Sequence, residues 1–243
     1  MLVSKRIDFI SSWINNYVKE KKFNLVVGVS GGIDSAVTST LCANTNIKTI
    51  VVSMPIRQNE TQHSLSLEHI NWLKENFNNI KVYTISLDNV FKSFQDIMKP
   101  FESELAFANS RSRLRMVALY QIAQSNNALV VGTGNKVEDF GIGFYTKYGD
   151  GGVDISPIAD CTKTQVWEMG KELGISKNII EAKPTDGLWD DSRDDEYQIG
   201  LSYEQLEEAM NNPKSQYFEK YNQLRKPNLH KMKPIPICKF EEE

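Results

Sequence analysis

The sequence has few cysteines, no long apolar run and no large excess of either charge. Its three cysteines, Cys42, Cys161 and Cys238, are odd in number, far apart and in no C-x-x-C pair, which argues against a disulfide framework and a zinc site. No apolar run approaches membrane-spanning length, and the N-terminal stretch lacks the cleavage site of a signal peptide. These absences predict a cytoplasmic protein with no membrane partner.

The charges are nearly balanced, with 28 Lys and Arg against 31 Asp and Glu and a formal net charge of −3. There is no basic tail, so nucleic acid is not expected as a partner. A chain of 243 residues is long enough for a large core, and we expect a single domain over residues 1–243.

Strand-like and helix-like segments alternate along the first half of the chain. Strands are predicted at 25–29, 47–53, 80–86 and 128–132, and helices at 1–20, 58–77 and 109–124. This order predicts an α/β fold with a doubly wound, mostly parallel sheet and helices on both faces. Ligands of such sheets bind beyond the carboxyl ends of the strands. The acidic segment 186–198 is predicted to be a mobile surface loop.

Residues 30–35, SGGIDS, follow the first strand and precede a helix. The stretch has neither the lysine of a Walker A loop nor the three-glycine spacing of a dinucleotide-binding turn. Its glycines would let an anion approach the backbone at the positive end of a helix, and a phosphate is the first expectation. Asp34 is then placed to bind Mg²⁺ beside the phosphates. The alternative is an ordinary turn in which Ser30 and Asp34 cap the helix.

The second informative segment is 132–165. Seven of the fourteen glycines lie in one stretch of 21 residues inside this segment, from 132 to 152. This density of glycine indicates backbone wrapped around a ligand. A flexible connection is the alternative, although linkers rarely carry aromatic residues such as Phe144, Tyr145 and Tyr148.

Several motifs in the right order resemble one family. They are SGGIDS, NSRSRLRM at 109–116, GTGNKVE at 132–138, FYTKYGDGGVDISP at 144–157, Pro184-Thr185 and His230-Lys231. With these the chain resembles the ammonia-dependent NAD synthetases, members of the ATP-pyrophosphatase superfamily with an adenine nucleotide alpha hydrolase-like fold. The resemblance implies a homodimeric ligase that uses ATP and Mg²⁺ to adenylate deamido-NAD, and then replaces AMP with ammonia to give NAD.

The resemblance also implies residue roles. The ATP-binding residues would be Gly28, Val29, Ser30, Gly31, Gly32, Ile33, Asp34, Ser35, Thr133, Lys163 and Thr185. The Mg²⁺ ligands would be Asp34 and Glu138, and deamido-NAD would be held by Arg113, Lys147, Asp154, His230 and Lys231. Asp34, Glu138 and Lys163 are expected to be catalytic, together with Asp150, which is placed by position as the proton acceptor for ammonium.

Two competing functions are a tRNA-modifying ATP-pyrophosphatase and a non-catalytic nucleotide sensor. The first calls for a basic surface or paired cysteines, and the second needs neither Glu138 nor Lys163. Only 22 residues precede the first strand, too few for a glutaminase domain, so free ammonia is the expected nitrogen donor. A separate glutaminase subunit stays open. His63 and His69, on the helix predicted at 58–77, are expected to be solvated.

Overall fold

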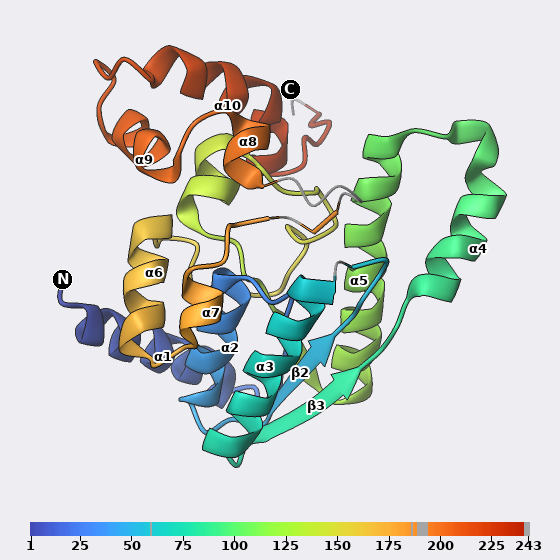
Figure 1. Cartoon of the computed structure of the whole chain (residues 1–243), viewed down its shortest axis with the longest axis vertical. Helices are drawn as coiled ribbons and strands as arrows, with labels where there is room; N and C mark the ends of the chain where they lie inside the picture. The colour runs from blue at the N-terminus through green and yellow to red at the C-terminus, as the bar shows by residue number, and fades with distance from the viewer. Residues whose placement is uncertain (59, 186, 189–193, 241–243) are drawn as a thin grey trace.

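A computed structural model describes residues 1–58, 60–185, 187–188 and 194–240. Its centre is a sheet of four strands, β1 (Asn24–Gly28), β2 (Thr49–Ser53), β3 (Ile80–Thr84) and β4 (Ala128–Val131). The spatial order is β3-β2-β1-β4, and each neighbouring pair is parallel. Because sequential strands are joined through helices, the doubly wound parallel sheet predicted from the sequence is confirmed (Figure 1).

The two faces of the sheet bury alternate residues of the strands. Leu25 and Val27 of β1 belong to a core with helices α1 (Val3–Lys19), α2 (Ile33–Ala43), α3 (Glu60–Asn76) and α6 (Lys163–Glu172). Val26, between them, points to the opposite core, with α4 (Asp88–Met98) and α5 (Glu104–Ser125). Burial on both faces explains why β1, β2 and β4 are mostly apolar runs instead of alternating ones, whereas the edge strand β3 is only partly buried.

The predicted elements are present, and the structure adds others. Helix α5 begins five residues before the predicted 109–124 helix, and α4 was not predicted. The shorter elements are the turn η1 (Lys99–Phe101), the π-helical turn η2 (Lys136–Ile142) and α7 (Lys177–Ile180).

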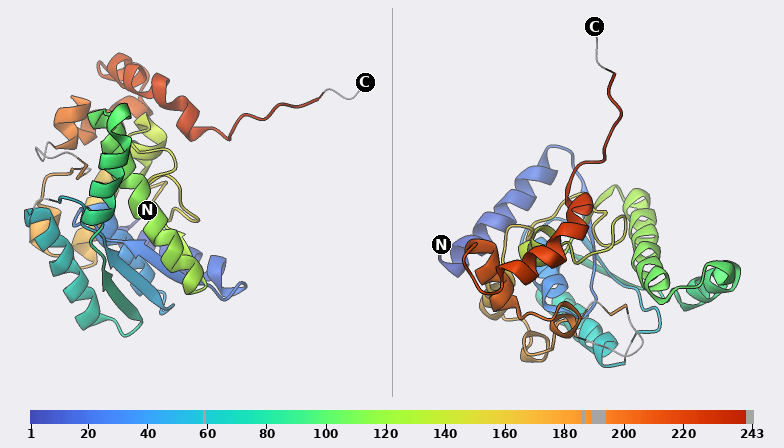
Figure 2. Two further views of the ribbon diagram at one scale, coloured as in Figure 1. Left: turned by 90° about the vertical axis from the view of Figure 1, so that its right-hand side faces the viewer. Right: turned by 90° about the horizontal axis from the view of Figure 1, so that it is seen from above.

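The C-terminal helices form a separate layer over the carboxyl end of the sheet. Helices α8 (Asp195–Ile199), α9 (Tyr203–Asn211) and α10 (Phe218–Met232) bury apolar residues against η2 (Figure 1). The prediction of a loop over 186–198 is wrong for its last residues, because Asp194 caps α8 by accepting a hydrogen bond from the Tyr197 N–H. Residues 186 and 189–193 of that segment lie outside the described residues. After α10, residues 233–240 extend away from the body (Figure 2).

The state of the cysteines and the apolar character of the helices follow from the structure. All three cysteines are free, with Cys42 and Cys161 buried and Cys238 exposed. None of the helices within the described part of the chain combines the length and the apolar character that a membrane span requires.

His69 is a correction to the sequence analysis. It was expected to be solvated, but its side chain is only 1 % exposed and lies between α3 and α2. Its Nε2 is 2.9 Å from the Ser39 hydroxyl, and its ring stacks on Trp72 with centroids 5.6 Å apart. Burial lowers the pKa of His69 to about 4, because the charged ring would lose its hydration.

This burial makes the folding free energy depend on pH. Between the unfolded pKa of 6.5 and the folded value of about 4, the unfolded chain binds a proton that the native protein does not. Stability contributed by neutral His69 is therefore complete above pH 6.5 and is lost as the pH falls toward 4. Urea unfolding should show a loss of about 1 kcal/mol between pH 7 and 5.5. His69→Gln should abolish that slope, whereas an unchanged slope would assign it to other groups.

Candidate active site

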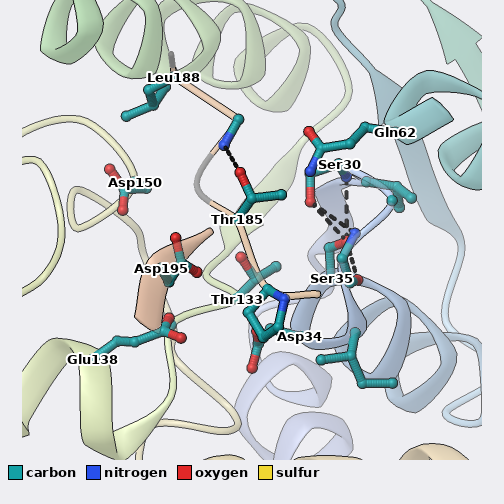
Figure 3. A pocket seen from close by; sticks show the side chains of 18 of the residues that line it. Ser30, Asp34, Ser35, Gln62, Thr133, Glu138, Asp150, Thr185, Leu188 and Asp195 are labelled. Atoms are coloured by element: carbon teal, nitrogen blue, oxygen red, sulfur yellow. Dashed lines mark hydrogen bonds between the residues drawn. The ribbon is translucent and has the colours of Figure 1, made fainter. Parts of the chain in front are cut away.

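A cavity of about 870 Å³ opens at the carboxyl end of the sheet. Its walls include the turn after β1, the segments after β2 and β4, the start of α6 and residues 182–185, 187 and 188 (Figure 3). The predicted site residues that line it are Gly28, Val29, Ser30, Gly31, Gly32, Ile33, Asp34, Ser35, Thr133, Glu138, Asp150, Lys163 and Thr185. Every residue predicted to be catalytic or to bind ATP therefore faces one space.

The SGGIDS turn is held by its own serines. The Ser35 hydroxyl donates to the Gly32 carbonyl at 2.9 Å and accepts from the Ser30 N–H at 3.2 Å. The side chain of Gln58 holds the turn from outside, donating to the Ser30 carbonyl at 2.9 Å. Helix α2 begins after Gly32 without a side-chain cap, so its first N–H groups are left for a ligand.

Asp34 does not cap α2, which argues against reading the segment as an ordinary turn. Its Oδ2 accepts from Lys163 Nζ at 2.6 Å and its Oδ1 from the Asn135 side chain at 3.1 Å. Lys163 also donates to Glu138 Oε1 at 2.9 Å. The lysine thus bridges two carboxylates that lie far apart in the sequence.

Local structure fixes both partners of this ion pair. Lys163 is the first residue of α6, where Thr162 and Gln165 form a capping box. Glu138 lies in the π-helical turn η2, whose N–H groups of Val137 and Glu138 are capped by the Asn135 side chain. Irregular turns of this kind often occur at functional sites, because they aim a side chain in a direction that a regular helix does not.

Burial and charge set the protonation of this group. The Lys163 side chain is 3 % exposed. Burial lowers its pKa, but the attraction of Asp34 and Glu138 more than offsets this, so the pKa is raised and the lysine stays charged. Burial raises the pKa of Asp34, although Lys163 opposes the shift. For Glu138 burial acts in the same direction, but Lys163 and a hydrogen bond from Tyr203 lower the pKa.

The donor set fits Mg²⁺ bound together with a nucleotide. Asp34 and Glu138 present carboxylate oxygens beside the SGGIDS turn, and in this structure they already hold a cation, the Lys163 ammonium. Within the described ranges no group of three or more His, Cys, Asp or Glu could form a complete protein cage for a metal. Mg²⁺ does not need such a cage, since one or two carboxylates and the phosphates of the substrate usually suffice.

Two further carboxylates face the cavity. Asp150 accepts hydrogen bonds from the Ser112 hydroxyl at 2.6 Å and the Thr146 N–H at 3.0 Å. Burial raises its pKa. Asp139, which the sequence analysis missed, lies so close to Gly134 that any Cβ there would clash with it. Burial and the neighbouring Asp150 raise the pKa of Asp139 well above its usual range.

Of the five residues predicted to hold deamido-NAD, four come together, although none of the five is among the residues that line the cavity. Arg113 donates to the Lys147 carbonyl, and Lys147 Nζ donates to the His230 carbonyl at 3.2 Å. Lys231 donates to the Gly143 and Tyr145 carbonyls, both at 2.8 Å. These contacts tie α10 to the 143–147 loop and gather basic groups at one place.

Asp154, the fifth of these residues, has different partners. Its Oδ2 accepts from the Val130 N–H at 2.7 Å and its Oδ1 from the Tyr120 hydroxyl at 3.3 Å. Asp154 therefore lies at the edge of β4, and Tyr120 of α5 is a neighbour that the sequence analysis did not single out.

Tyr203 and Asp195 are the other residues that the sequence analysis missed. The Tyr203 hydroxyl donates to Glu138 Oε1 at 2.6 Å and lies 3.3 Å from Asp195 Oδ2. Figure 3 shows Asp195 beside Glu138 at the cavity. No sequence signal marks Tyr203, because it reads as an apolar position of α9, 65 residues from its partner.

The cavity at the carboxyl end of the parallel sheet combines a glycine-rich turn at a helix N-terminus with two carboxylates and a buried lysine. This combination is typical of an enzyme that uses a nucleotide. The sequence profile of the NAD synthase family matches residues 6–237. The chain belongs to the NAD synthase family, whose members are ligases, and the resemblance stated from its motifs is confirmed.

Individual relatives agree with this assignment. The chain is 37 % identical to the NH(3)-dependent NAD(+) synthetase of Mesoplasma florum over 213 residues, 85 % of this chain and 84 % of the relative. The structure of NMN synthetase from Francisella tularensis superposes with a TM-score of 0.91, 31 % identity and coverage of 99 % of this chain and all of that one. The NH3-dependent NAD synthetase of Campylobacter jejuni, solved with nitrate, has a TM-score of 0.80 and 23 % identity, covering 98 % of this chain and 100 % of that one, and supports the fold alone.

Proposed function

We propose that this protein is an ammonia-dependent NAD synthetase, which uses ATP to convert the nicotinate carboxylate of deamido-NAD into the amide of NAD. The observation that carries the proposal is the cavity in which the SGGIDS turn, Asp34, Glu138 and Lys163 face one another. The acceptor, deamido-NAD, is inferred from the names of the relatives, and the reaction with ATP is inferred from this geometry.

In the first step, an oxygen of the carboxylate attacks the α-phosphorus of ATP, and the bond to the β-phosphate oxygen breaks. Pyrophosphate leaves toward the free N–H groups at the start of α2, where Gly31 and Gly32 let it approach the backbone. Lys163 stabilises the charge that develops on the leaving pyrophosphate. Asp34 and Glu138 would hold Mg²⁺, which when bound neutralises the phosphate oxygens. Thr133 and Thr185 line the same cavity and are assigned to ATP binding.

In the second step, ammonia attacks the acyl carbon of the adenylate, the bond from that carbon to the phosphate oxygen breaks, and AMP leaves with the electron pair of this bond. The nitrogen releases a proton to solvent as the amide forms. Ammonium must first lose a proton. We assign this proton to Asp150, because it lines the cavity and its burial raises the pKa, which makes the carboxylate a better base.

Binding of the acceptor, deamido-NAD, is assigned to five side chains: Arg113, Lys147, Asp154, His230 and Lys231. Arg and Lys side chains suit the phosphates and carboxylate of deamido-NAD, and Asp154 suits a hydroxyl donor. Because residues of α10 and of the 143–147 loop form this region, binding of the acceptor would depend on the C-terminal layer.

A second candidate acceptor is the mononucleotide half of deamido-NAD, with NMN as the product. The specific observation is the similarity to NMN synthetase from Francisella tularensis, with a TM-score of 0.91 and 31 % identity. The chemistry at the carboxylate would be the same, and only the contacts with the distant part of the acceptor would differ.

The test compares the two acceptors and the two nitrogen donors. Purified protein is incubated with ATP, Mg²⁺ and ammonium, and with either deamido-NAD or nicotinate mononucleotide, and the amide, AMP and pyrophosphate are measured. We expect the higher kcat/KM with deamido-NAD, no product when glutamine replaces ammonium, and transfer of ¹⁸O from the carboxylate to AMP. A higher kcat/KM with the mononucleotide would favour the second candidate. ADP and orthophosphate as products would contradict both.

We also propose that the chain is a single domain that acts as a cytoplasmic homodimer. Free cysteines support a reducing compartment. Exposed apolar side chains on neighbouring elements, such as Ile97, Phe101 and Leu105 at 76 %, 73 % and 60 %, support a surface that a second copy covers. Gel filtration with light scattering tests the dimer.

A further inference from the structure

Tyr203 is a fully buried polar side chain in contact with the proposed catalytic group. Its relative exposure is 0 %, and it lies at the first turn of α9, in the C-terminal layer. Its ring contacts the Lys163 ammonium, which lies 4.7 Å from the ring centroid, and makes a T-shaped contact with Trp167, with ring centroids 5.7 Å apart. The side chain is therefore held in one orientation by contacts that do not depend on its hydroxyl.

The hydroxyl of Tyr203 is aimed at the oxygen of Glu138 that also accepts from Lys163. The two bonds to Oε1 measure 2.6 Å from Tyr203 and 2.9 Å from Lys163. A carboxylate that accepts two hydrogen bonds on one oxygen has little freedom to rotate about its last bond. The hydroxyl is the donor in this contact, because a carboxylate oxygen can only accept.

The same tyrosine connects the site to the segment before α8. Asp195 Oδ2 is 3.3 Å from its hydroxyl, and the Asp195 N–H donates to the Pro184 carbonyl at 3.0 Å. Pro184 precedes Thr185, which lines the cavity. Glu138, Tyr203 and Asp195 thus form a continuous chain from η2 to α8.

We propose that Tyr203 is a positioning residue, which fixes the Glu138 carboxylate, through its hydroxyl, in the orientation that binds the nucleotide with its divalent cation. The proposal rests on the proposed function of Glu138. A phenylalanine ring would fill the same space as the tyrosine ring, so the positioning role belongs to the hydroxyl. Residues behind a metal ligand typically change metal affinity or activity by about 10-fold to 100-fold when they are removed.

The test is Tyr203→Phe, with Tyr221→Phe as its matched control. Tyr221 is buried in the same layer and donates to the Gly141 carbonyl at 3.2 Å, so both variants lose one buried hydroxyl, but only one of these contacts Glu138. Calorimetric titration of ATP with and without Mg²⁺, in the absence of an acceptor, gives a readout besides turnover. We expect Tyr203→Phe to weaken binding of MgATP about 10-fold or more, with a smaller effect on ATP alone, and Tyr221→Phe to bind as the wild type.

A double-mutant cycle with Glu138→Gln decides whether Tyr203 acts through Glu138. If it does, Tyr203→Phe should change the affinity for MgATP less than about 2-fold in the Glu138→Gln background. Equal factors in both backgrounds, or equal behaviour of the Tyr203 and Tyr221 variants, would overturn the proposal. Failure of the wild type to amidate deamido-NAD would overturn the proposed function instead, because the cycle is measured on nucleotide binding alone.

Discussion

Replacing Lys163 with methionine is expected to lower kcat by about 10²-fold or more and to lower the free energy of unfolding by about 3–5 kcal/mol. Methionine keeps much of the length of the lysine but removes the charge between Asp34 and Glu138, which lie 2.6 and 2.9 Å from Nζ. The carboxylates of Asp34 and Glu138, which are mostly shielded from solvent, would then lie close together without a cation between them. Removing the group that stabilises the phosphate charge should by itself lower kcat by about 10²-fold to 10³-fold.

Lys136→Met is the matched control for the loss of a lysine ion pair. Lys136 binds Asp160 at 2.8 Å, but its side chain is 43 % exposed and that of Asp160 is 96 % exposed, so solvent screens the pair. Its loss should cost less than about 1 kcal/mol and leave kcat unchanged. Urea unfolding and steady-state kinetics measure both quantities. A Lys163→Met protein with the stability and kcat of the Lys136 variant would contradict the assignment of Lys163.

The phosphate side of the site was the part that the sequence could predict. SGGIDS is contiguous, and a strand, a glycine turn and a helix are local structures, so their arrangement follows from the order of the residues alone. Glu138 was found because it lies in the GTGNKVE motif, and Lys163 because it matches an ATP-contacting position of the family. Their direct contact across 25 residues depends on how η2 and α6 pack, which no local pattern contains.

The contacts of Tyr203 and His69 could not be predicted for the same reason. Tyr203 and His69 each occupy helix positions whose neighbours come from other elements, Glu138 in one case and Ser39 in the other. A tyrosine or histidine on an amphipathic helix looks alike in sequence whether it packs, binds or is solvated. The start of α8 was missed because its acidic composition is typical of a loop, while the capping contact of Asp194 stabilises a short helix.

Gly31→Ala is expected to have the second large effect, with loss of ATP binding as its main consequence. Gly31 has a φ of +97°, and a Cβ at this position would lie 2.4 Å from the Gln62 carbonyl oxygen and 3.0 Å from the Ser66 nitrogen. Both atoms belong to the backbone of α3 and cannot rotate away as a flexible side chain can. The turn must therefore move by several tenths of an ångström or more, which takes the first N–H groups of α2 out of register with the phosphates.

Gly174→Ala separates this clash from the cost of the backbone conformation. Gly174 also has a positive φ, +74°, but no heavy atom lies within 4 Å of a Cβ there. Both variants should lose about 1 kcal/mol of stability from the strained φ, and Gly31→Ala should lose more because of the clash. A displacement of the turn of about 1 Å predicts a fall in kcat/KM for ATP of about 100-fold, whereas Gly174→Ala should turn over as the wild type. Steady-state kinetics with varied ATP and thermal unfolding measure the two effects. If Gly31→Ala keeps the wild-type kcat/KM for ATP, the SGGIDS backbone does not hold the phosphates.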